Sequence, residues 1–103
     1  EDKSLILGSG HISGTALPNK IGNCVIAGHR DSFFKHLNKL SEGDKIILES
    51  KTKKFSYIIN SIQIVNPSDI YWLNQNDLTE LTLIDGVVTG ITIVVSIFKL
   101  FPA

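Results

Sequence analysis

Residues 10–34 hold most of the side chains in this chain that could do chemistry. A short apolar run, residues 24–27, ends at Gly28 and is followed directly by His29, Arg30 and Asp31. Histidine changes its charge near neutral pH, and at the exit of a buried strand, beside two charged groups, it is suited to proton transfer. A lone histidine at a strand end is more often structural, so the context of His29 decides its role.

That context resembles the histidine segment of the sortases, the cysteine transpeptidases of Gram-positive cell surfaces, and most of all their class D type. The likeness covers roughly residues 8–84. It is carried by Gly10-His11-Ile12, Gly14-Thr15-Ala16-Leu17-Pro18, Ala27-Gly28-His29-Arg30-Asp31, Gly43-Asp44, residues 64–69 and Leu81-Thr82-Leu83-Ile84. It implies that His29 is the catalytic histidine, which protonates a leaving amine.

The resemblance also implies a function. Sortases are extracytoplasmic, membrane-anchored enzymes, and we expect no cofactor in this chain. They cleave a Leu-Pro-containing sorting signal and join surface proteins to an amine of the cell envelope. Their thiolate attacks a peptide carbonyl, and an arginine holds the carbonyl oxygen or the substrate. We therefore expect a sorting-signal peptide and an envelope amine as partners.

The chain departs from the family where the nucleophile belongs. The family continues from the equivalent of Ile84 into a threonine-cysteine pair, whereas this chain continues into Asp85-Gly86. Gly86 therefore occupies the nucleophile position without a thiol. Lys99 is the only base near the position of the family's arginine, and it is a weak stand-in because an ammonium lacks the bidentate fork of a guanidinium. We expect no cleavage by this chain, and no rescue by Gly86→Cys alone.

The other candidate side chains have simpler interpretations. Cys24 lies five residues before His29 in the same expected strand. This odd separation predicts opposite faces, with the two backbones about 16 Å apart. We expect Cys24 to be a buried core residue. His11 and His36 lack the spacing of a metal-ligand pair with His29, so we expect no metal site.

Three functions remain open. The first is a sortase-type transpeptidase domain that is inactive in this chain. The second is a catalytically dead barrel that binds a peptide or a protein. The third is a product whose tail after Ile84 is altered or frameshifted, although the apolar alternation from Ile91 to Ile97 speaks against it. The coding DNA would distinguish the third.

The residue pattern predicts one all-β domain over residues 1–103, a sortase-type β-barrel of short strands that lacks the family's first strands. We expect strands at residues 23–28, 45–49, 54–65, 81–84 and 90–98. Short helical segments are expected at residues 32–40 and 67–72. A change of apolar parity at Asn60-Ser61 indicates a bulge. The predicted core includes Val25, Ile47, Ile59, Leu83 and Ile93.

Composition excludes several classes of protein. Ten basic and ten acidic residues give no net charge, which gives no electrostatic reason to expect nucleic acid or an anionic membrane as a partner. The apolar segment 86–102 is shorter than the roughly 20 residues of a spanning helix, and its β-branched residues favour strands. No signal peptide and no methionine are present, so we expect part of a longer protein. A missing opening strand would leave a sheet edge that another copy could cover.

Overall fold

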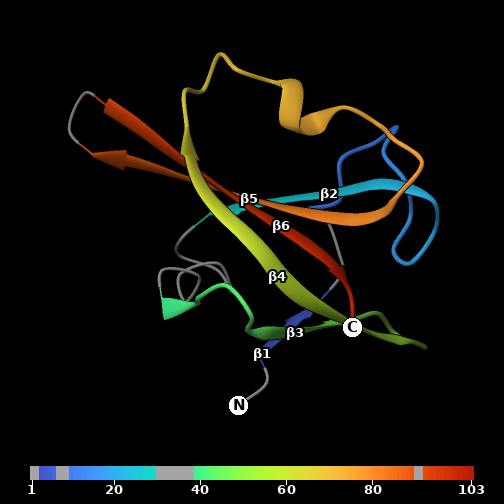
Figure 1. The fold of residues 1–103 in the computed structure, drawn as a ribbon. Helices are drawn as coiled ribbons and strands as arrows, with labels where there is room; N and C mark the ends of the chain where they lie inside the picture. Colours follow the sequence, from blue (N-terminus) through green and yellow to red (C-terminus); the bar gives the residue numbers. More distant parts are fainter. Residues whose placement is uncertain (1–2, 7–9, 30–38, 90–91) are drawn as a thin grey trace.

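The computed structural model describes residues 3–6, 10–29, 39–89 and 92–103, with side chains for residues 10–28, 39–86 and 94–103. Six strands form one sheet in the order β1-β3-β4-β6-β5-β2. The strands are β1 (Lys3–Ile6), β2 (Gly22–His29), β3 (Lys45–Glu49), β4 (Lys54–Val65), β5 (Thr79–Thr89) and β6 (Thr92–Pro102). The sheet curls into part of a barrel, and a short 3-10 helix, η2 (Tyr71–Leu73), lies over it (Figure 1). The expected all-β, sortase-type fold is confirmed.

The sheet is mixed. β3, β4, β6 and β5 pair in an antiparallel manner, whereas β1 lies parallel to β3 and β2 lies parallel to β5. Side chains alternate between the two faces along each strand. One face carries the main core, which includes Cys24, Ile26, Leu81 and Leu83. The opposite face carries a second, smaller cluster in which Trp72 packs against Val95 and Ile97.

A bulge in β4 exchanges its two faces at the position that the sequence predicted. Ile59 pairs with Leu100 and Ser61 pairs with Lys99, so the register shifts at Asn60. Ile59 lies in the main core, and Ile62 packs against that core after the bulge, although the two differ in parity. Ser61 and Gln63 therefore lie on the same face as the Trp72 cluster.

Several predicted elements are confirmed and others need correction. The strands at 45–49 and 54–65 have the predicted bounds, whereas β5 extends at both ends beyond the predicted 81–84. β6 continues past the predicted end at residue 98 to Pro102, and residues 90–91 of that prediction lie outside the described residues. β1 was not predicted from the sequence. Residues 32–38 of the expected first helix lie outside the described residues, and the second helical segment is only η2.

The predicted core is partly right. Val25, Ile59 and Leu83 are buried, but Ile47 is not, because Ile46 and Leu48 point into the main core instead. Residues 46–48 are all apolar, so the sequence did not reveal which parity faces inward. The side chain of Ile93 lies outside the described part. Within the apolar segment 86–102, residues 86–89 and 92–102 form strands, as expected. Among the described residues no helix is long and apolar enough to cross a membrane.

The outer edge of β2 is covered by the chain itself. The amide of Ala27 donates to the Gly10 carbonyl at 2.9 Å, and that of Ile12 donates to the Val25 carbonyl at 2.8 Å. His11 Nε2 donates to the Ala16 carbonyl at 2.9 Å, which gives this histidine a structural role in the same segment. This edge therefore needs no second copy to satisfy its backbone.

Gly22, the first residue of β2, is expected to be intolerant of alanine. Its φ is +116°, and an added Cβ would lie 2.8 Å from Gln75 Oε1 and 3.0 Å from Ala16 Cβ. Gly22→Ala should cost about 2–3 kcal/mol in urea unfolding, because steric overlap adds to backbone strain. Gly43→Ala is the matched control, since Gly43 has φ +91° with open space around it, and it should cost about 1 kcal/mol. Equal losses would mean that the overlap at Gly22 does not matter.

Candidate functional site

The register of β2 and β5 brings the predicted histidine and nucleophile positions together. The two parallel strands pair from Gly22 and Thr79 to His29 and Gly86, which form the last pair of the ladder. Neighbouring strands lie about 4.8 Å apart, so the His29 and Gly86 backbones are adjacent. Residues that are 57 positions apart in the sequence thus meet at one end of the sheet.

Gly86 has room for a side chain. Among the atoms that the structure describes, a Cβ built on it would have no heavy atom within 4 Å, and its φ lies outside the left-handed region that only glycine adopts readily. By alternation along β5, that side chain would share a face with Ile84, which packs against the Trp72 cluster. Neither the backbone nor the packing therefore requires glycine at this position.

The side chain of Cys24 lies on the opposite face of the sheet from the one that a side chain at position 86 would occupy. It is 1% exposed and packs in the main core, on the opposite face from Ile84. Burial raises the pKa of its thiol to about 11. The expected role of Cys24 as a core residue is confirmed, and the thiol is both sheltered and protonated at neutral pH.

Cys24 is therefore expected to resist alkylation in the folded protein. A raised pKa lowers the thiolate fraction, and the thiolate is the reacting species. At pH 8, iodoacetamide should modify Cys24 about 100-fold or more slowly in buffer than in 8 M urea. The folded-state rate should continue to rise with pH toward about 11. Rates that match in buffer and urea would contradict this burial.

Lys99 lies at the other end of the same face. It pairs with Thr82 in β5, whereas Val95 pairs with Gly86, so the two positions are four residues apart, or about 13 Å. Lys99 Nζ donates to the Trp72 carbonyl at 2.6 Å and to Thr82 Oγ1 at 2.8 Å. The structure does not bring Lys99 to Gly86, which argues against the weak arginine role expected for it.

Lys99 also forms an ion pair with Glu80 at 3.4 Å, with side chains that are 20% and 8% exposed. Burial lowers the pKa of Lys99, and the charge of Glu80 opposes this effect. Glu80 accepts a further hydrogen bond from Asn76 Nδ2 at 2.8 Å. The pair therefore ties β6 and β5 to residues 66–78, which we call the β4–β5 connection.

Asn23 is the second anchor of the β4–β5 connection. Its side chain is fully buried and donates to the Trp72 carbonyl at 3.0 Å, and it accepts from Thr82 Oγ1 at 2.6 Å. Gln75 bonds both backbone groups of Asn23, at 3.0 and 2.9 Å. Side chains from three strands thus hold the connection against the sheet.

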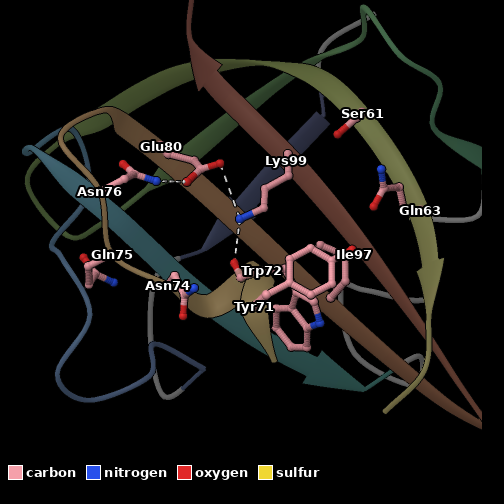
Figure 2. Close-up of a pocket in the computed structure, with 10 residues that line it drawn as sticks. All are labelled: Ser61, Gln63, Tyr71, Trp72, Asn74, Gln75, Asn76, Glu80, Ile97 and Lys99. Carbon is pink, nitrogen blue, oxygen red and sulfur yellow. Dashed lines mark hydrogen bonds and ion pairs between the residues drawn. The ribbon is translucent and has the colours of Figure 1, made fainter. Parts of the chain in front are cut away.

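A pocket of about 320 Å³ opens between the β4–β5 connection and the sheet (Figure 2). Its walls come from β4, β5, β6 and the connection, and its lining residues are Ser61, Gln63, Tyr71, Trp72, Asn74, Gln75, Asn76, Glu80, Ile97 and Lys99. This pocket was not predicted from the sequence. The signal that could have revealed it was the polar pair Ser61 and Gln63 directly after the predicted bulge.

The pocket and the Gly86 end are parts of one surface. Glu80, Ile84 and Gly86 alternate onto one face of β5, and Ile97 and Lys99 lie on the matching face of β6. Trp72 and the half-buried Ile84 lie between the two ends. An extended ligand could therefore run from Gly86 across apolar side chains into a polar pocket.

A curled sheet that pairs the predicted histidine position with the predicted nucleophile position fits the fold expected from the sequence, and the comparisons with known proteins agree. A family model described as the sortase domain matches residues 1–85. The chain belongs to the sortase family. The match ends one residue before Gly86, so Gly86 and all of β6 lie beyond it.

Relatives and solved structures give the same family. Sortase D of Bacillus subtilis is 32% identical over 77 residues, which make up 74% of this chain and 39% of the relative. Sortase SrtE1 of Streptomyces coelicolor is 41% identical over 61 residues, 54% of this chain and 17% of the relative. The structure of a Clostridium perfringens Sortase D5 transpeptidase superimposes with a TM-score of 0.79 at 36% identity, covering 90% of this chain and 60% of that one. The chain thus spans less than two thirds of the length of each.

Proposed function

We propose that this chain is a sortase domain that binds a Leu-Pro-type sorting signal of surface proteins without cleaving it. The observation that carries this proposal is the position of Gly86, which pairs with His29 at the end of the regular ladder between β2 and β5 and has no thiol. In the longer protein, the domain would lie outside the cytoplasm, anchored at the membrane of a Gram-positive cell. The reaction of the family would there join the surface protein to an amine of the envelope.

The surface next to Gly86 supports a peptide ligand. Val65, Leu73 and Ile84 are partly buried and flank the Trp72 cluster, so each leaves apolar area that a leucine or proline side chain could cover. The hydrogen bonds of Asn23 and Lys99 hold the β4–β5 connection above this area. A preformed wall lowers the entropic cost of ordering a bound peptide.

The absence of a nucleophile argues against cleavage. Covalent catalysis needs a thiolate within hydrogen-bond reach of its base. Gly86 has no side chain, and Cys24 lies in the main core on the opposite face. A histidine alone does not replace the covalent intermediate.

Titration with a short LPxTG-type peptide tests the proposal. Trp72 is the only tryptophan of the chain and lies in the wall of the site, so its fluorescence reports binding. We expect saturation with a Kd of about 1 mM or tighter, no response to a scrambled peptide, and uncut peptide by mass spectrometry after overnight incubation. Equal responses to both peptides would refute peptide recognition. Cut peptide would refute the inactive state.

A further inference from the structure

The pocket between Lys99 and the β4–β5 connection lies too far from Gly86 to take part in chemistry there. We propose that it binds a neutral polar side chain, an amide or a hydroxyl, of the bound peptide. That side chain belongs to the residue four positions away from the one that lies at Gly86. This inference rests on the peptide binding proposed above and adds the class of side chain that the site selects.

The spacing follows from the strands themselves. Val95 pairs with Gly86, and Lys99, at the pocket, is four residues further along β6. A peptide that lies extended along the sheet rises by the same amount per residue as β6 does, about 3.3 Å. Its fourth residue from Gly86 therefore reaches the pocket.

The charges in the pocket are already compensated. The ammonium of Lys99 has three N–H donors, and it has three partners: the Trp72 carbonyl, Thr82 Oγ1 and the Glu80 carboxylate. Glu80 is bonded by Lys99 and by Asn76. A charged ligand side chain would lose hydration without gaining an opposite charge, so the pocket disfavours acidic and basic residues.

Neutral hydrogen-bonding groups remain available on two walls. The side chains of Ser61 and Gln63, from β4, and of Asn74, from the connection, have no hydrogen-bond partner among the described residues. The bulge at Asn60 turns Ser61 and Gln63 toward this pocket. An amide offers both a donor and an acceptor, which matches an amide or hydroxyl of the ligand.

An apolar ligand side chain fits less well. It would cover the amides of Gln63 and Asn74 and remove their water without replacing the lost hydrogen bonds, which costs binding free energy. Two of the apolar walls, Trp72 and Ile97, are 9% and 2% exposed and so offer little area in return. The third, the ring of Tyr71, is 60% exposed, and the flat face of a ligand amide can pack on it as an alkyl group can. The pocket therefore selects polarity without charge.

Three peptides test this selection, identical except for Asn, Leu or Glu four residues from the scissile threonine. One set of three peptides carries the change four residues before the threonine, and a second set carries it four residues after. Together the two sets cover both directions in which the peptide chain can run along the sheet. In one of the two sets, titrations followed by Trp72 fluorescence should show the Asn peptide binding about five- to tenfold more tightly than the other two.

Two variants assign the effect to the pocket. Gln63→Leu should remove the preference for Asn while leaving binding of the Leu peptide within about twofold. Ile64→Ala is the matched control, because Ile64 follows Gln63 in β4 and is 76% exposed outside the pocket; it should keep the preference. Equal binding of the three peptides in both sets would overturn the inference and leave peptide binding standing. No binding of any peptide would instead overturn the proposed function.

Discussion

Gly86→Cys is expected to give a protein that forms a thioester with an LPxTG-type peptide, whereas the parent chain forms none. The register places His29 beside this position, and a Cβ there meets no heavy atom of the described side chains or backbone within 4 Å. The new thiol therefore needs no rearrangement of the strands. This geometry reverses the sequence-based expectation that a cysteine alone would not rescue the site.

The restored activity should remain weak. Lys99 is about 13 Å along the sheet from Gly86 and is bonded to Trp72 and Glu80, so Lys99 does not replace the arginine that holds the carbonyl oxygen in the family. Loss of one such group costs roughly 10²–10³ in rate. Intact-mass spectrometry should show the acyl adduct, with slow release of the product.

Two controls show whether the acyl adduct depends on His29 and on the thiol introduced by Gly86→Cys. His29→Ala in the Gly86→Cys background should keep the thiol but lose the acyl adduct. Cys24 serves as an internal control, because it is buried and should stay unmodified. If iodoacetamide readily labels the thiol introduced by Gly86→Cys and no acyl adduct forms even so, the His29 end lacks the geometry that we infer.

Asn23→Ala is expected to cause the largest loss of stability. The buried amide donates to the Trp72 carbonyl, and more weakly at 3.4 Å to the Asn74 carbonyl, and it accepts from Thr82. Its removal leaves buried polar groups without partners and opens a cavity, which together cost about 2–4 kcal/mol in urea unfolding. The loss should be accompanied by faster hydrogen exchange in the β4–β5 connection.

Asn66→Ala is the matched comparison. Asn66 is exposed, and within the described part of the chain its side chain bonds Ser68 alone, through the backbone amide at 2.9 Å and the hydroxyl at 2.8 Å. Water can replace these contacts, so the loss of unfolding free energy should stay at about 0.5–1 kcal/mol, which is typical of one hydrogen bond. Similar losses for the two variants would show that Asn23 does not anchor the connection.

The sequence predicted the family, the sheet and the bulge better than it predicted the site. The change of parity in β4 was visible because Phe55, Tyr57 and Ile59 share one parity before it, whereas Ile62 and Ile64 take the other after it. Ile47 was misplaced because its neighbours on both sides are apolar, so alternation carried no information there. β5 was cut short because Asp85 and Gly86 disfavour strands, yet pairing with β2 and β6 carries the strand through both.

The pocket was not predictable in the same way. Its walls come from three strands and the β4–β5 connection, and their approach depends on registers that single-strand patterns do not encode. Lys99 illustrates the point. By position in the sequence it is near the family's arginine, but the pairing of β6 with β5 sets it beside Thr82.

The number of residues in β4 after the bulge matters more than most of their side chains. Asn60 is the extra residue of the bulge, so its deletion would leave Ser61 paired with Lys99. Deleting Ile62 instead would shift every later residue of the strand by one, which would turn Gln63 toward the main core and Ile64 toward the pocket. Substitutions at Ser61 or Gln63 change the ligand preference one residue at a time. A length change within residues 62–65 acts differently, because it exchanges the core-facing and the pocket-facing residues together. In descendants of this chain, residues 62–65 should therefore vary in composition while their number stays fixed, and length changes should accumulate at the bulge and in the exposed turn between β3 and β4.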